Sequence, residues 1–176
     1  ALRGTLAFAL RRNGHTNLYA LPARGGGLIR LTAGPWDDRD PAVSPDGSQV
    51  AFASHRDGNW DLYLLTLRGR EVRRLTATPG FEGRPAWSPD GQWIAYESYQ
   101  DQDYDIWIMA VNGSQAPIQL TNNPGADTSP SWDPRGRRIA FVSDRDGLRE
   151  IYLINLDKPD ERYSEVTHSA DEACLD

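Results

Sequence analysis

The chain has 176 residues, a formal net charge of −6 and 39% apolar residues, a composition that fits one soluble globular unit with a core of its own. No apolar run reaches the roughly eighteen residues of a membrane span, and the 19 basic residues lie scattered among 25 acidic ones without the stripe that tracks a nucleic-acid backbone. The single Cys174 can form neither an internal disulfide nor a two-cysteine metal site.

In chain order, the first four short runs that favour strands lie near residues 5–10, 17–22, 28–32 and 41–43. The same runs return along the chain with a nearly constant period. The first of them recurs as Leu6-Ala7-Phe8, Val50-Ala51-Phe52, Ile94-Ala95-Tyr96 and Ile139-Ala140-Phe141, at offsets of 44, 44 and 45 residues. A repeat of this length with four strands is typical of a propeller blade.

The sequence therefore predicts an all-β fold of four-stranded propeller blades, forming either a single propeller domain or a partial propeller. The repeats span roughly residues 1–40, 41–84, 85–129 and 130–176. We expect the aromatic residues of the repeat to be largely buried between sheets, namely Phe8, Phe52, Tyr96, Phe141, Trp87 and Trp132.

Turn residues separate the predicted strands. Ser44-Pro45-Asp46-Gly47 and Ser88-Pro89-Asp90-Gly91 place Pro and Gly where a tight turn needs them, and residues 133–136 are a variant of the same turn. These turns should join the fourth run of one period to the first run of the next as hairpins. Arg56-Asp57-Gly58 marks the following turn, from which Gln100-Asp101-Gln102 departs.

The repeated Pro-x-Trp-Ser-Pro-Asp-Gly, Ala-Phe-x-Ser-x-Arg-Asp-Gly and Asp-Leu/Ile-Tyr patterns resemble the WD-like repeat of TolB and related bacterial propellers. The resemblance covers essentially the whole chain, although Val43 stands in place of the Trp. It implies a propeller that is often extracytoplasmic, periplasmic or secreted, and that often holds a protein or peptide. The additional N-terminal domain of TolB has no counterpart in this sequence, so the role of TolB in an envelope complex is not carried over.

Two partial motifs favour structural roles over chemistry. Residues 57–61 and 101–105 imitate the first half of a calcium loop, but both lack its later Gly and Glu, so we assign no metal site. The acids Asp61, Asp105 and Glu150 should instead hydrogen-bond backbone where their strands begin. The three His residues occupy different places in the repeat and no Gly-x-Ser-x-Gly occurs, so we predict neither an enzyme nor a cofactor.

A column of acids precedes the Pro of each fourth run by three residues: Asp38, Glu82 and Asp127, with Glu172 as a fourth member if the last loop is one residue shorter. In a propeller these positions would line the mouth of the central channel. Like charges held together favour a positively charged ligand. Trp36 and Phe81 on the same loops either add amphipathic contact surface or pack beneath their loops. Alternatively, each acid caps local backbone or pairs with an Arg such as Arg39 or Arg84.

The leading hypothesis is a non-catalytic propeller that binds a peptide, a protein segment or a cation at the channel mouth, with a peptide or protein favoured. Two alternatives stay open: a gating or recognition propeller of a larger prolyl-oligopeptidase-like peptidase, and a purely structural oligomerising repeat. Residues 173–175 fall where the first strand of the opening blade belongs, so the termini could build one composite blade. Because four blades in a closed ring would be strained, we expect a homo-oligomer formed by strand exchange.

Overall fold

A computed structural model describes residues 4–158 and 162–167. This part of the chain has no helix, and therefore none that could span a membrane. The first repeat forms β1 (Thr5–Arg12), β2 (His15–Pro22) and β3 (Ile29–Arg30). The others form β4 (Asp38–Val43), β5 (Gln49–Ser54), β6 (Asp61–Thr66), β7 (Glu71–Arg74), β8 (Phe81–Trp87), β9 (Trp93–Gln100), β10 (Asp103–Ala110), β11 (Ile118–Gln119), β12 (Asp127–Trp132), β13 (Arg138–Ser143), β14 (Glu150–Asn155) and β15 (Tyr163–Glu165).

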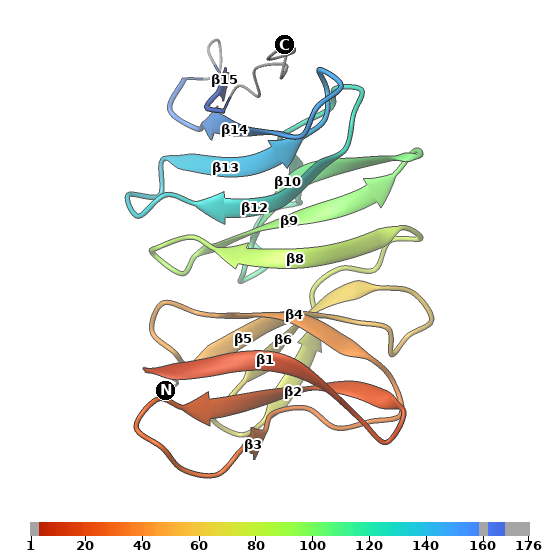
Figure 1. The fold of residues 1–176 in the computed structure, drawn as a ribbon, viewed down its shortest axis with the longest axis vertical. Helices are drawn as coiled ribbons and strands as arrows, with labels where there is room; N and C mark the ends of the chain where they lie inside the picture. Colours follow the sequence, from red (N-terminus) through yellow and green to blue (C-terminus); the bar gives the residue numbers. More distant parts are fainter. Residues whose placement is uncertain (1–3, 159–161, 168–176) are drawn as a thin grey trace, which may run out of the picture.

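These strands form four antiparallel sheets in which neighbours in the sequence are neighbours in space. The first sheet is β1-β2-β3, and the other three have four strands each, in the orders β4-β5-β6-β7, β8-β9-β10-β11 and β12-β13-β14-β15. Figure 1 shows the sheets following one another along the long axis, with the first and the fourth at opposite ends. The predicted all-β fold of four-stranded blades is confirmed.

The Ser-Pro-Asp-Gly turns form the predicted hairpins between β4 and β5 and between β8 and β9. Gly47 and Gly91 both have a φ of 72°, a conformation that favours glycine. The Asp46 carboxylate accepts hydrogen bonds from the Ser44 hydroxyl at 2.6 Å and from the Ser48 backbone N–H at 3.0 Å. These bonds, first among them that of Ser44, lower the pKa of Asp46 to about 2. The turn is therefore held by its own polar side chains.

The core lies between successive sheets. Phe52, Tyr96 and Phe141 are buried as predicted, and each pairs across its sheet with an aromatic residue of the next strand. Phe8, in contrast, is only half-buried, because no earlier sheet covers the first one within the described residues.

We call the first strands of the last three sheets, β4, β8 and β12, the inner strands. Trp87 in β8 and Trp132 in β12 are only half-buried, and not largely buried as predicted. Each donates its indole N–H to a backbone carbonyl of the preceding sheet. Trp87 bonds to Ala42 at 2.9 Å, and Trp132 bonds to Ala86 at 3.1 Å. The indole rings therefore tie neighbouring sheets together while remaining partly exposed.

The inner strands begin earlier than predicted. The sequence indicated a strand from residue 41, but β4 starts at Asp38 and β8 at Phe81. A β-bulge in each strand accommodates the proline, which has no N–H to give to the ladder, and pairing continues on both sides of it. The residue before each proline has a positive φ, 52° at Asp40 and 47° at Arg84. The acids Asp38, Glu82 and Asp127 therefore belong to the strands and not to the preceding loops.

Candidate functional site

The acids Asp38, Glu82 and Asp127 lie at equivalent places near the start of β4, β8 and β12. Each is paired across its sheet with a serine, respectively Ser54, Ser98 and Ser143. All three acids are 0% exposed. The fourth member of the column, Glu172, lies outside the described residues.

Two of the three acids have an arginine partner from the same sheet. The Arg56 guanidinium lies 3.1 Å from the Asp38 carboxylate, and that of Arg145 lies 3.0 Å from Asp127. The sequence had suggested Arg39 or Arg84 as partners, but these pair with Asp40 and Glu97. The hairpin after the second strand of the sheet brings the arginine back to the acid, a geometry that spacing along the chain does not reveal.

Glu82 differs because Gln100 stands where the other sheets have arginine. Its Oε1 accepts hydrogen bonds from the hydroxyls of Thr78 and Ser98, the latter at 3.3 Å. Its Oε2 is buried and has no hydrogen-bond partner among the described residues. Burial raises the pKa of Glu82, the hydroxyls of Thr78, Thr76 and Ser98 lower it, and the charge of Asp61 in the preceding sheet adds to the effect of burial.

Asp38 also has one buried oxygen without a hydrogen-bond partner in the described part of the chain, its Oδ2. The other oxygen of that carboxylate, however, is held by the charged Arg56. No such ion pair reaches Glu82 within the described residues. Among the three acids, Glu82 is therefore the one that lacks a neutralising cation there.

Trp36 covers one of the two ion pairs. Its ring centroid lies 5.1 Å from Cζ of Arg56, the partner of Asp38. The indole also packs closely against Gly34 in the loop before β4. These contacts indicate that Trp36 shields the ion pair between Arg56 and Asp38.

Phe81 belongs to an aromatic cluster at the start of β8. It contacts Tyr104 edge to face at 5.8 Å, and Tyr104 in turn contacts Tyr99 at 4.8 Å between ring centroids. The Arg39 guanidinium of the preceding sheet lies 4.9 Å from the Phe81 centroid. Tyr99 is 40% exposed, so the cluster offers part of its surface to solvent.

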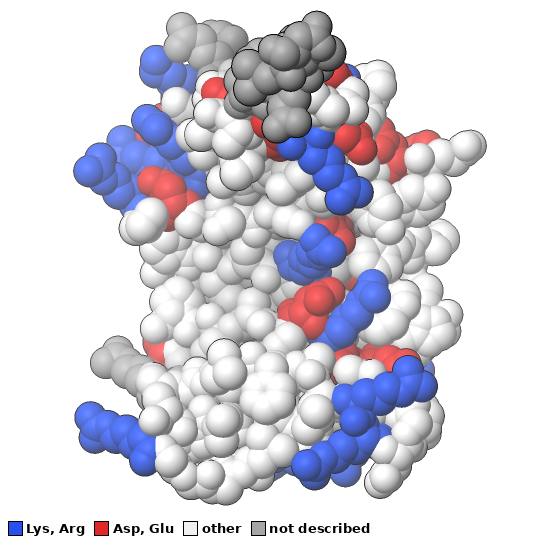
Figure 2. All heavy atoms as spheres, viewed as in Figure 1, with Lys and Arg blue, Asp and Glu red and all other residues white. Residues whose placement is uncertain are grey.

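Sequence reasoning missed a row of polar side chains at the bulges of the inner strands. Arg84 lies 3.5 Å from Glu97 and donates a hydrogen bond to Ser129 of the next sheet. The Ser129 backbone N–H donates to Glu97 at 3.0 Å. Figure 2 shows basic and acidic patches alternating along the sheets on one face of the molecule. The sequence contains a sign of this row, because a polar residue directly precedes the proline of each repeat: Asp40, Arg84 and Ser129.

Asp61 and Asp105, near the start of the third strands β6 and β10, bond to side chains more than was predicted. Asp61 binds Arg74 at 2.6 Å, and Asp105 accepts hydrogen bonds from Gln119 at 2.9 Å and Thr121 at 3.0 Å. The threonine hydroxyl itself accepts a backbone N–H, that of Ile106 at 2.9 Å. Among the described residues, no three His, Cys, Asp or Glu side chains are arranged to hold a metal ion.

The comparisons with known proteins match this architecture. The profile of the TolB beta propeller domain matches residues 37–117 and 76–173. TolB from Acinetobacter baumannii superposes with a TM-score of 0.85 at 24% identity, covering 96% of this chain and 43% of that one. A TolB candidate from Agrobacterium tumefaciens gives 0.80 at 26% identity, covering 92% and 60%. The chain thus spans about half the length of these relatives.

A puromycin-hydrolysing peptidase of Mycobacterium tuberculosis has the same fold over 95% of this chain and 31% of its own, with a TM-score of 0.69 at 20% identity. No curated protein sequence matches the chain significantly. Because the family profile covers well over half of the residues, the chain belongs to the TolB β-propeller domain family.

Proposed function

We propose that this chain is a non-catalytic binding domain that holds a peptide or protein segment at the channel mouth, where the inner strands begin. The observation that carries the proposal is Glu82, a fully buried carboxylate whose Oε2 has no partner within the described residues. A buried charge without a partner is costly, and a positively charged group of a ligand would offset that cost.

The surroundings of Glu82 support a peptide over a bare cation. The aromatic cluster of Phe81, Tyr99 and Tyr104 lies at the same end of β8. Aromatic side chains of this kind are enriched where proteins bind one another. Asp38 and Asp127 belong to the proposed site as members that are already neutralised.

A display selection tests this proposal. Random peptides are selected on the wild-type protein, and their affinities are then compared for Glu82→Gln, Tyr104→Ala and Arg137→Gln, the last an exposed control at the opposite end of the strands. Losing a charge-assisted or an aromatic contact should weaken binding about tenfold or more in the first two variants and leave the control unchanged. Peptides that bind all three variants equally would refute the proposed site.

The fold likeness to the peptidase of M. tuberculosis favours a second candidate, a recognition propeller within a larger hydrolase. Hydrolysis of prolyl peptides by the full-length gene product would support it, and a full-length product without a hydrolase domain would reject it. From its family we also propose an extracytoplasmic location, which cell fractionation with a compartment marker can test.

A further inference from the structure

The repeat builds the same guanidinium site twice. In the second sheet, Arg56 donates to Asp38 at 3.1 Å and to the Ser54 hydroxyl at 2.9 Å. Its Cζ lies 5.4 Å and 4.5 Å from the ring centroids of Phe52 and Tyr63. The site therefore consists of a carboxylate, a hydroxyl and two aromatic rings.

The fourth sheet repeats this arrangement with nearly the same dimensions. Arg145 donates to Asp127 at 3.0 and 3.1 Å and to the Ser143 hydroxyl at 2.8 Å. Its Cζ lies 5.3 Å and 4.5 Å from the rings of Phe141 and Tyr152. Two separate copies thus show which chemical group these positions accept.

The third sheet keeps the other parts of the site without the arginine. Glu82 and Ser98 stand at the acid and serine positions, and Tyr96 and Trp107 pair across the sheet at the aromatic positions. Gln100 takes the place of the arginine and donates to the Ser98 hydroxyl at 2.8 Å. The buried Oε2 of Glu82 is left without a partner in the described part of the chain.

An acidic hollow of about 610 Å³ adjoins the Gln100 position. Gln100 and Trp107 line it together with Asp101, Asp103 and Asp105, and its lining within the described residues includes no Lys or Arg.

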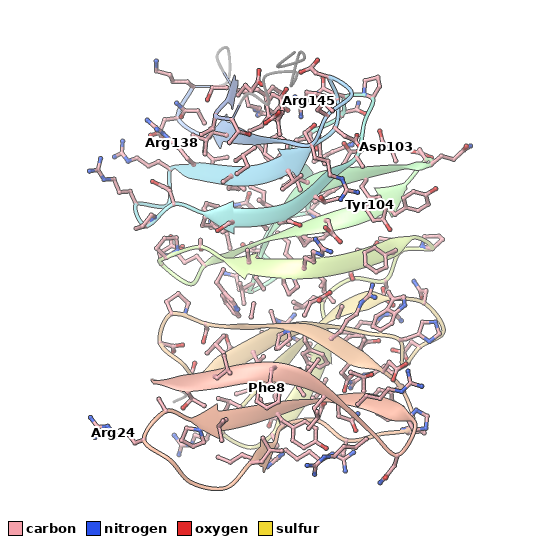
Figure 3. The ribbon with its side chains drawn as sticks, viewed as in Figure 1. Phe8, Arg24, Asp103, Tyr104, Arg138 and Arg145 are labelled. Atoms are coloured by element: carbon pink, nitrogen blue, oxygen red, sulfur yellow. The ribbon has the colours of Figure 1, made fainter. Side chains whose placement is uncertain are left out.

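The second sheet fills the corresponding space with Arg74, which binds Asp61. The third sheet has Gln119 at that position, and Gln119 binds Asp105. Figure 3 shows Asp103 and Tyr104 at the same end of the sheets as Arg145.

We propose that the third sheet binds an arginine side chain of a partner peptide, whose guanidinium takes the place that Arg56 and Arg145 fill in the sister sheets. This assignment rests on the proposed function and names the ligand of the same site. Arginine fits better than lysine because a planar guanidinium can stack on the rings while it donates to both Glu82 and Ser98. The half-buried Gln100 side chain must move aside to admit it.

An NMR titration with acetyl-Gly-Arg-Gly-amide tests the inference, with the Trp107 indole N–H as the reporter. The arginine peptide should give a saturable shift, the lysine peptide a weaker one and the citrulline peptide none. Gln100→Arg supplies the missing arginine from within the chain and should weaken binding about tenfold or more, as should Glu82→Gln. Gln92→Arg adds the same charge to an exposed position at the far end of the same sheet and should bind like the wild type.

Three results would overturn the inference: no saturable shift, equal affinity for the arginine and lysine peptides, or undiminished binding by Gln100→Arg. A separate outcome distinguishes it from the proposed function. If peptides from the display selection need Glu82 but contain no arginine, the binding site stands and the arginine assignment fails.

Discussion

The acids Asp38, Glu82 and Asp127 occupy one position of the repeat yet differ in their electrostatics. Asp38 and Asp127 are each neutralised by a guanidinium that is itself mostly buried, with side-chain exposures of 16% for Arg56 and 13% for Arg145. The partners of Glu82 are hydroxyl groups. The third sheet has Gln100 where the second and fourth sheets have arginine, so among the described residues its buried acid, Glu82, lacks the ion pair that its counterparts form.

This difference predicts opposite effects of removing the charges. Asp38→Asn and Asp127→Asn should each lower the free energy of unfolding by about 1.5–3 kcal/mol, because a charged hydrogen bond is lost and a mostly buried guanidinium keeps no counterion. Glu82→Gln should leave stability unchanged or raise it at neutral pH. Urea denaturation of the three variants measures the effect. An equal loss in all three would mean that Glu82 is structurally compensated like the others.

The pH dependence of stability provides a second test. Because burial raises the pKa of Glu82 above its ordinary value of 4.5, the folded state binds a proton more tightly than the unfolded state does. The stability that this proton contributes is complete below pH 4.5 and is lost as the pH rises through the raised pKa. The advantage of Glu82→Gln over the wild type should therefore be absent at acidic pH and grow towards neutral pH. A constant difference in urea midpoint across this range would contradict the raised pKa.

At the scale of the strand and hairpin, the sequence predicted most of the fold. The repeated runs that contain Phe52 and Tyr63 recur often enough to reveal the strands, and the repeated Ser-Pro-Asp-Gly turns reveal their connections. The start of β4 could not be predicted, because it depends on a bulge at Asp40 that lets the strand continue past a proline. The partner of Asp38 was missed for a related reason: Arg56 reaches it through the register of two hairpins.

The same limit applies to the candidate site. The departure of Gln100 from the Arg-Asp-Gly pattern is visible in the sequence. Its consequence for Glu82 is not, because the two residues are 18 positions apart and meet through Ser98 on the neighbouring strand. The shared binding role of the acids stays a prediction.

The loop before β4 offers a test of packing at the scale of an element. A Cβ at Gly34 would overlap the Trp36 indole, so Gly34→Ala should displace the ring and lower the free energy of unfolding by about 1–3 kcal/mol. A Cβ at Gly27 would meet no heavy atom within 4 Å, so Gly27→Ala serves as the matched control. Urea denaturation followed by tryptophan fluorescence measures both variants. Equal free energies of unfolding for Gly34→Ala and Gly27→Ala would show that the loop rearranges at little cost and that Trp36 is not held in place.

At the scale of the whole molecule, the two outer sheets expose apolar residues that the inner sheets bury. Leu6 is 63% exposed, whereas its counterparts Val50 and Ile94 are 0% exposed. Ile151 in the fourth sheet is 41% exposed, whereas its counterpart Leu62 is 0% exposed. Sheets of this kind bury their faces against neighbours, so this chain on its own presents apolar surface at both ends.

We therefore predict that the chain self-associates in solution. Light scattering at micromolar concentration should give about twice the mass of one 19.6 kDa chain, as expected of two chains that complete one ring. The substitution Leu6→Gln should shift the equilibrium towards monomer. A mass of 19.6 kDa alone would exclude the exchanged ring. The composite blade itself involves residues 173–175, which lie outside the described part of the chain.

The proposed ligand binds where the inner strands begin, beside Glu82. Backbone amide chemical-shift mapping with a display-selected peptide tests this placement most directly. The largest shifts should fall on residues 80–84 and 97–107, and Glu82→Gln should remove them. Largest shifts at the opposite end of the strands, around the turns at residues 45–47 and 89–91, would contradict it.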